Sequence, residues 1–195
     1  MEKLETGEEK DAIKSEEFAI IKNNKLLTTF SSEDIYGYLF AKGGVTAIDH
    51  EIEDGENVVV LHISTLEKKK SINLKDDNKV EVKLDVNIDS GMSEVIGFAD
   101  LTLLEQIEKF EELMNKDIKE RILKTFAIAQ NNKSDIFGYG LMIHKKHPKQ
   151  WKELEDNWDE IFPTIDLQVE VKTKVLTTGQ VSQNIEMERK KNDNR

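Results

Sequence analysis

Cysteine is absent from the 195 residues, and proline occurs only twice. Without cysteine the chain can form no disulfide, no thiolate metal site and no cysteine nucleophile. The sequence also lacks the run of about 18 apolar residues that predicts a membrane-spanning helix. The N-terminus has no apolar segment of the kind found in signal peptides. These absences exclude several classes of protein and leave a domain built from ordinary packing.

Positive charge is scarce relative to negative charge. Asp and Glu number 39 against 28 Lys and Arg, which gives a net charge of -11. Nucleic-acid affinity depends on Lys and Arg neutralising phosphates, so this balance argues against nucleic acid as a partner. It argues equally against simple electrostatic adhesion to anionic lipid.

Apolar residues are nevertheless plentiful enough for a core. Leu, Ile, Val and Phe total 56 of 195 residues, well above the roughly 20% below which highly charged chains stay disordered. Residues 1–15 read as a flexible acidic leader and residues 184–195 as a polar tail. Between them, residues 16–183 show no change of composition, so we expect a single domain.

The first part of that domain predicts a hairpin and a short helix. Apolar runs at 18–21 and 26–30 flank Lys22-Asn23-Asn24-Lys25, and Asn tolerates the positive φ of a tight turn. Ser31 or Ser32 can cap a helix that ends at Gly43-Gly44. A strand at 45–48 follows.

Long strands come next. Residues 57–74 begin with a continuous apolar run and then alternate less cleanly through Ile63, Leu66 and Ile72. Residues 79–88 alternate strictly between apolar and polar, which predicts a strand with one buried face. The turn between these strands falls at 75–78. The last strand, 165–175, alternates in the same way.

Two stretches have helical periodicity. Apolar residues from Leu103 to Ala129 recur every three or four positions, which predicts a helix over 100–130 long enough to span the sheet. A second pattern runs from Pro148 to Phe162 and ends at Pro163. The sequence therefore predicts an α+β fold, an antiparallel sheet with helices packed on one face.

Histidines offer little chemistry. His144 and His147 stand three residues apart, as a metal pair on a helix would. No third ligand accompanies them in a known pattern, and Lys145 and Lys146 between them repel a cation. His50 and His62 stand on strands among carboxylates. We expect no metal and no cofactor.

Carboxylates are clustered in one place. Glu153, Glu155, Asp156, Asp159 and Glu160 form an acidic cluster that admits three interpretations: a solvated helix face, a docking surface for a basic partner, or a small hydrolase. No nucleophile elbow, phosphate-binding loop or dinucleotide loop is present, since Gly138-Tyr139-Gly140 has only two glycines and no strand before it. We therefore expect that the protein is not an enzyme.

Aromatic residues concentrate in 134–163, which holds five of the thirteen in the chain. Ser134 or Asp135 can cap a short helix here, and Gly138 and Gly140 allow close packing because they lack a Cβ. One interpretation is a helical corner whose rings seal an end of the core. The other is a groove for a small molecule or a partner helix.

The same segment carries a family resemblance. The run Ser134 to Gly140, then Ile143-His144, Pro148, Trp151, Trp158 and Phe162-Pro163, resembles the C-terminal domain of GerAC-type spore germination proteins, the C subunits of nutrient germinant receptors. The strand after Pro163 with Gly179 behind it, the opening hairpin from Phe18 to Leu26, and Gly37 in the short helix are similar to the same family. The resemblance covers about residues 16 to 180.

The resemblance implies a role in nutrient-triggered spore germination. Members are lipoproteins on the outer face of the inner spore membrane, held by a lipidated N-terminal cysteine and assembled with membrane-embedded A and B subunits. This chain lacks that cysteine, so we expect it to be the C-terminal domain alone, non-enzymatic and working by protein–protein contact. The alternative is a domain that binds the nutrient germinant. The motif residues, structural or in contact with partners, are Asp135, Phe137, Gly138, Tyr139, Gly140, Trp151, Trp158, Pro163 and Gly179.

Overall fold

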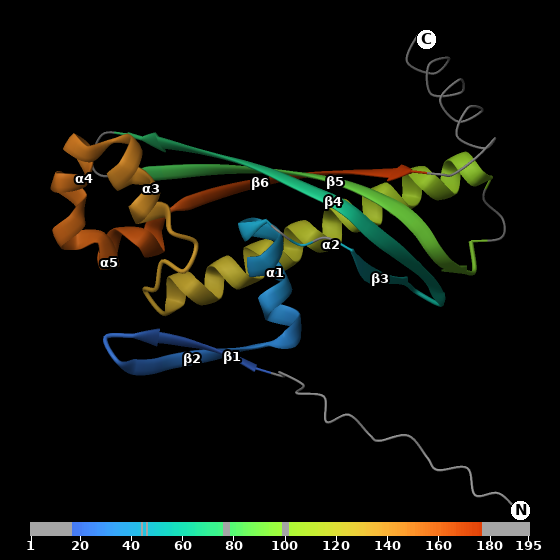
Figure 1. Ribbon diagram of the computed structural model, residues 1–195, viewed down its shortest axis with the longest axis horizontal. Helices are drawn as coiled ribbons and strands as arrows, with labels where there is room; N and C mark the ends of the chain where they lie inside the picture. The colour runs from blue at the N-terminus through green and yellow to red at the C-terminus, as the bar shows by residue number, and fades with distance from the viewer. Residues whose placement is uncertain (1–16, 44, 46, 76–78, 99–101, 177–195) are drawn as a thin grey trace, which may run out of the picture.

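The computed structural model describes residues 17–43, 45, 47–75, 79–98 and 102–176. A four-stranded sheet forms one layer, and the helices lie on one side of it (Figure 1). The predicted α+β class is therefore confirmed. The leader, the tail, Gly179 and most of the turn expected at 75–78 lie outside the described residues.

The sheet has the order β3-β4-β5-β6. Its strands are β3 (Ile48–Asp54), β4 (Asn57–Leu74), β5 (Val80–Ile96) and β6 (Asp166–Leu176). The first three pair antiparallel, as predicted. β6 pairs parallel with β5, so the expectation of a wholly antiparallel sheet is wrong at this strand. A parallel neighbour needs a long crossover, which the helices between β5 and β6 provide.

The first strand of the sheet differs from its prediction. We expected a strand at 45–48, whereas β3 begins at Ile48 and continues to Asp54. Ala47, just before it, has a φ of 57°, which interrupts an extended backbone. Only His50 and Ile52 of β3 are buried, so its sequence shows too few apolar positions to reveal a strand.

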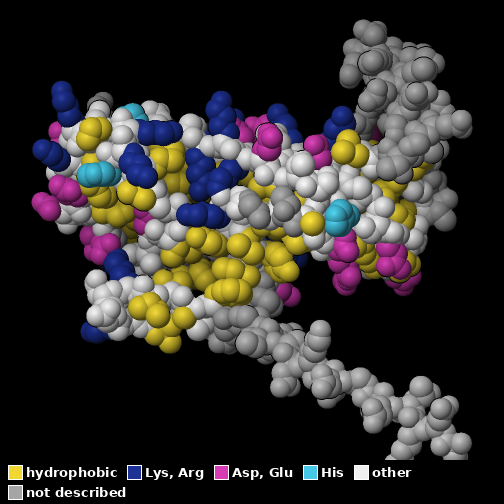
Figure 2. Space-filling view, in the orientation of Figure 1, with side chains coloured by type: hydrophobic (Ala, Val, Ile, Leu, Met, Phe, Trp, Pro, Cys, Tyr) yellow, Lys and Arg dark blue, Asp and Glu magenta, His cyan; other side chains and the backbone are white. Residues whose placement is uncertain are grey.

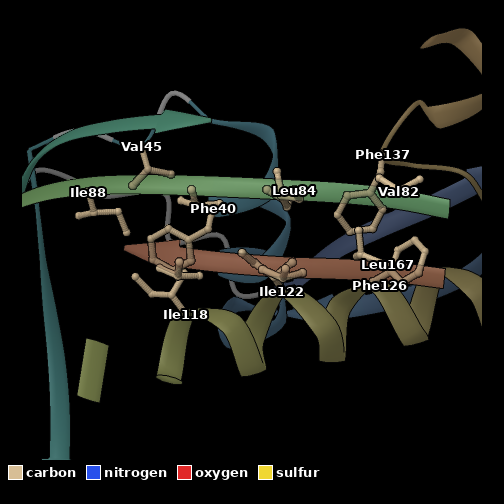
Figure 3. Close-up of a cluster of buried hydrophobic side chains, with 14 of the residues drawn as sticks. Phe40, Val45, Val82, Leu84, Ile88, Ile118, Ile122, Phe126, Phe137 and Leu167 are labelled. Carbon is tan, nitrogen blue, oxygen red and sulfur yellow. The ribbon is translucent and has the colours of Figure 1, made fainter. Parts of the chain in front are cut away.

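The long helix α2 (Leu103–Asn131) confirms the helical period and starts slightly later than predicted. Thr102 caps it, and Glu105 completes a capping box by accepting from the Thr102 backbone N–H. The helix runs along the sheet (Figure 1), and the core lies between them, as Figure 3 shows for Ile118 and Ile122 facing the strands. Its fully buried positions include Ile107, Phe110, Met114, Ile118, Ile122 and Ala129.

The predicted hairpin and short helix are also confirmed. Strands β1 (Glu17–Lys22) and β2 (Lys25–Ser31) pair around Asn23 and Asn24, both at positive φ. Ser31 caps α1 (Ser32–Lys42), and Gly43, at φ 79°, ends it. The hairpin forms a sheet of its own, on the far side of α1 and α2 from the main sheet (Figure 1).

The second helical region is broken rather than continuous. After α3 (Tyr139–Lys146) come α4 (Pro148–Leu154), η2 (Glu155–Asn157), α5 (Trp158–Ile161) and η3 (Phe162–Thr164). The prediction of one helix over 148–162 is wrong because Asn157, at φ -114° and ψ 14°, leaves the helical region. Within the described residues, no helix is both long and apolar enough to cross a bilayer.

Candidate functional site

The motif residues that the structure describes, all but Gly179, lie at one end of the sheet, around α3, α4 and α5 (Figure 1). We call this the aromatic corner, comprising Phe137, Tyr139, Trp151, Trp158 and Phe162. Its rings contact one another: Phe137 stacks on Tyr139 with centroids 5.9 Å apart, and Trp151 lies edge-on to Trp158 at 5.3 Å. All but Trp151 are buried. The corner therefore packs as an extension of the core.

Asp135 holds the corner together. Its carboxylate accepts from the backbone N–H of Tyr139 at 3.0 Å and of Gly140 at 2.7 Å, which caps α3. The same carboxylate accepts from Trp158 Nε1 at 3.2 Å. One side chain thus fixes the start of α3 and the position of an indole from α5. The sequence predicted that Ser134 or Asp135 caps a helix here; the N-cap residue is Gly138, and Asp135 accepts from the first two N–H groups of the helix. The sequence gave no sign of the bond to Trp158.

Both motif glycines have a structural reason. Gly138 precedes α3 at φ 73°, a conformation that side-chain-bearing residues rarely adopt. At Gly140 a Cβ would come within 2.8 Å of Trp158 Nε1 and 2.9 Å of Trp151. The helix therefore packs directly against both indoles, and those rings fill the space in which a ligand beside Gly140 would lie.

Pro163 lies in η3, whose backbone is held by a residue that the sequence did not single out. Gln130, near the end of α2, donates through Nε2 to the carbonyls of Pro163 at 2.9 Å and Ile165 at 3.0 Å. A half-buried Gln at the end of an amphipathic helix carries no sequence signal that separates it from a solvated one. Gln130 fastens the segment that leads into β6.

The Tyr139 hydroxyl is the corner's unusual polar group. The side chain is fully buried, and the oxygen has no hydrogen-bond partner among the described residues. Burial, with the Asp135 charge nearby, raises the pKa of Tyr139 well above its usual range. The phenol therefore stays neutral under physiological conditions.

The histidines and acidic residues do not gather into a metal site in the described part of the chain. His144 is exposed, and no group of three potential metal ligands occurs among the described residues. All five residues of the acidic cluster are exposed, and two of them pair with lysines, Asp159 with Lys22 and Glu160 with Lys133. Exposure leaves these carboxylates solvated, so the hydrolase interpretation loses its basis.

One histidine, His50, is buried and hydrogen-bonded to a carboxylate. His50 is buried on β3, where its Nε2 lies 2.8 Å from Asp117 Oδ2 of α2. Arg121 Nε donates to the same oxygen at 2.6 Å. Burial alone would raise the pKa of Asp117, but the hydrogen bonds from His50 and Arg121 outweigh it and lower that pKa below its usual value. The group joins the sheet to α2.

The hairpin and α1 together expose several large apolar side chains. A groove of about 330 Å³ lies between the hairpin, α1 and the loop after α2. Figure 2 shows hydrophobic side chains over α1 and on the hairpin. The sequence predicted the hairpin, but periodicity did not reveal that Phe18, Ile21, Leu26 and Leu27 stay exposed while Ile20 and Phe30 are buried. The groove is lined by Phe18, Ala19, Ile20, Ile21, Phe30, Ile35, Tyr38, Ser134 and Ile136.

Fold and site together define an α+β domain in which the described aromatic residues of the motif pack with the core and the hairpin exposes apolar side chains. The chain belongs to the family described as "Spore germination B3/GerAC like, C-terminal", whose model matches residues 16–179. The expected family is thereby confirmed, and membership supports a role in spore germination.

Two named spore germination proteins are similar to parts of this chain. Spore germination protein KC of Bacillus subtilis (strain 168) is 34% identical over 70 residues, which is 35% of this chain and 17% of that protein. Spore germination protein B3 of the same strain is 29% identical over 140 residues, 72% of this chain and 32% of that protein. The chain thus spans less than a third of the length of either relative.

A solved structure shares the fold. The crystal structure of the GerBC protein superposes with a TM-score of 0.69 at 18% identity, covering 79% of this chain and 48% of that one. At this identity the likeness supports the fold alone. It places the α+β arrangement seen here within a longer protein.

Proposed function

We propose that this chain is a non-enzymatic domain of a germinant-receptor C subunit, and that it supports nutrient-triggered germination by contact with the membrane-embedded A and B subunits. The lipid anchor implied by the resemblance, on the outer face of the inner spore membrane, belongs to this proposal as well. The observation that carries the contact mechanism is the apolar surface of the hairpin. Five of the ten large apolar side chains exposed by the described residues lie on the hairpin or on α1.

These side chains are placed for contact. Ile21 and Leu26 are cross-strand neighbours at the end of the hairpin, and 67% and 62% of their surfaces are exposed. Neighbouring residues in this register point to the same face, so the two form one exposed pair. Contiguous apolar surface of this kind is typical of a protein–protein contact site. The occupant that we propose for the groove is an apolar segment of an A or B subunit.

The aromatic corner, by contrast, supports the elements that line the groove. Ile136 and Ser134, which precede the corner, also line the groove, and Tyr38 of α1 packs edge-on to Phe137 at 5.8 Å. Gly140 leaves no space for a ligand at the indoles. These contacts favour a supporting role for the motif over the alternative of a germinant pocket at Gly138-Tyr139-Gly140.

Co-purification from spore membranes tests the proposal. The intact protein with Ile21→Glu and Leu26→Glu should lose the A and B subunits while keeping its fold, because both side chains are already exposed in the free domain. Ile96→Glu, at a site 52% exposed on β5, is the matched control and should retain both subunits. Retention of the subunits by the hairpin variant, with a native far-UV spectrum, would refute the contact surface.

A further inference from the structure

Two lysines of β4 lie on the face of the main sheet that the helices cover. Lys68 and Lys70 stand opposite Val86 and Leu84 of β5, whose side chains are fully buried. Directly paired residues point to the same side of a sheet, so both lysines lie on the face that the helices cover. The sequence shows them as the break in alternation between Leu66 and Ile72.

An open edge makes room for these side chains. β3 pairs with β4 only up to Ile63, so β4 is an edge strand from there to Leu74. Lys70 Nζ lies 5.3 Å from the centroid of the Tyr139 ring, a cation–π arrangement. The end of Lys68 lies against the cap of α1, since a Cβ on Gly43 would be 3.0 Å from its Cδ, Cε and Nζ.

Lys42, the last residue of α1, adds a third ammonium group. Its charge acts on both strand lysines. Burial first, and then the Lys68 and Lys42 charges, lower the pKa of Lys70 from 10.5 to about 8. Burial and Lys42 lower that of Lys68. The positive charges of Lys42 and Lys68 therefore disfavour the charged form of Lys70.

No carboxylate neutralises this cluster in the described part of the chain. None of the three lysines makes an ion pair with another described residue. This is unexpected in a chain with 39 Asp and Glu against 28 Lys and Arg. Asp135 attracts Lys70 from a distance, but its oxygens are bound to Tyr139, Gly140 and Trp158. The C-terminal end of α1 carries only about half a negative charge.

We propose that Lys42, Lys68 and Lys70 form a binding site for a phosphate-type oxyanion. A multivalent anion between the three ammonium groups supplies the missing counter-charge and relieves their repulsion. Figure 2 shows Lys and Arg side chains gathered on this face, bordered by hydrophobic ones. The phosphate can be free in solution or part of a lipid headgroup, and both sources present the same chemistry.

Two probes separate the sources. The first is inorganic pyrophosphate, followed by the chemical shifts of the lysine side-chain nitrogens, and the second is sedimentation with phosphatidylglycerol vesicles against phosphatidylcholine ones. The test variant carries Lys42→Gln, Lys68→Gln and Lys70→Gln. A control with the same loss of charge carries Lys145→Gln, Lys146→Gln and Lys149→Gln, all exposed on α3 and α4.

The wild-type protein should bind one or both probes, and the Lys70 pKa should rise when pyrophosphate is bound. The test variant should lose about 100-fold in vesicle affinity, since each lysine near an anionic surface contributes a factor of about five. Binding of pyrophosphate alone would assign a free phosphate, and binding of vesicles alone a headgroup. Absence of binding to either probe, or an equal loss in the control, would overturn the site.

Discussion

At the scale of single residues, two carboxylates each join elements that lie far apart in the sequence. Asp135 joins the start of α3 to Trp158, and Asp117 joins α2 to His50 on β3. Each carboxylate accepts hydrogen bonds from partners far apart in the chain. Their removal therefore leaves several donors unpaired at once.

We expect Asp135→Ala to lower the free energy of unfolding by about 3 kcal/mol, because unsatisfied buried donors cost about 1–3 kcal/mol each. Two backbone N–H groups and an indole N–H lose their acceptor. Urea denaturation followed by tryptophan fluorescence measures the change. Asp166→Asn, at an exposed position of β6, is the control and should alter stability by less than about 0.5 kcal/mol. Equal stability of the two variants would refute the bridging role.

Acid should weaken the interactions of Asp117 with His50 and Arg121. Its pKa is lowered in the folded state, so the unfolded state binds the proton more tightly and stability falls as the pH drops below about 4. Asp117→Asn should cost about 2 kcal/mol at pH 6, since hydrogen bonds to charged groups contribute about 1.5–3 kcal/mol. The difference from the wild type should shrink by pH 3. A difference independent of pH, in denaturation curves across this range, would contradict the assignment.

At the scale of elements, the crossing of α1 over α2 depends on one glycine. A Cβ at Gly37 would lie 2.2 Å from both Arg121 O and Thr125 Oγ1. The Thr125 hydroxyl also donates to the carbonyl of Asp34 at 2.6 Å, which fixes the two helices at this point. The hairpin is attached to the domain through α1, so this crossing positions the proposed contact surface.

Gly37→Ala should therefore destabilise the domain by about 2–3 kcal/mol, as overpacking typically does, despite the better helix propensity of alanine. Gly91→Ala is the matched control, because a Cβ there meets nothing closer than 3.9 Å. Thermal denaturation of both variants measures the difference. A Gly37→Ala domain as stable as the control would show that the helices can separate without cost.

Elements with long, regular patterns were predictable from the sequence. The period of α2 and the alternation of β5 extend far enough to be unambiguous, and the family motif placed the aromatic corner. Alternation does not encode strand direction, so the parallel pairing of β6 was missed. The break at Asn157 was missed because Trp151, Leu154, Trp158 and Ile161 also fit a continuous helix. The lysine cluster depends on the register of β4 against β5, which arises only in the folded sheet.

At the scale of the whole molecule, two surfaces of different chemistry lie on one side of the main sheet. The hairpin presents Ile21 and Leu26, and the lysine cluster lies where α1 ends against β4. The net charge of -11 gives no sign of this cluster, because it is a sum over the whole chain. The proposed contact with a protein and the proposed binding of a phosphate group both depend on this separation of apolar and basic surface.

Germination of spores tests the central claim most directly. Spores whose only copy of this protein carries Ile21→Glu and Leu26→Glu should respond to nutrient as slowly as spores that lack the protein, as measured by the fall in optical density. Spores with Ile96→Glu should germinate like the wild type. Wild-type germination of the hairpin variant, at an equal level of folded protein, would contradict a function based on contact through the hairpin.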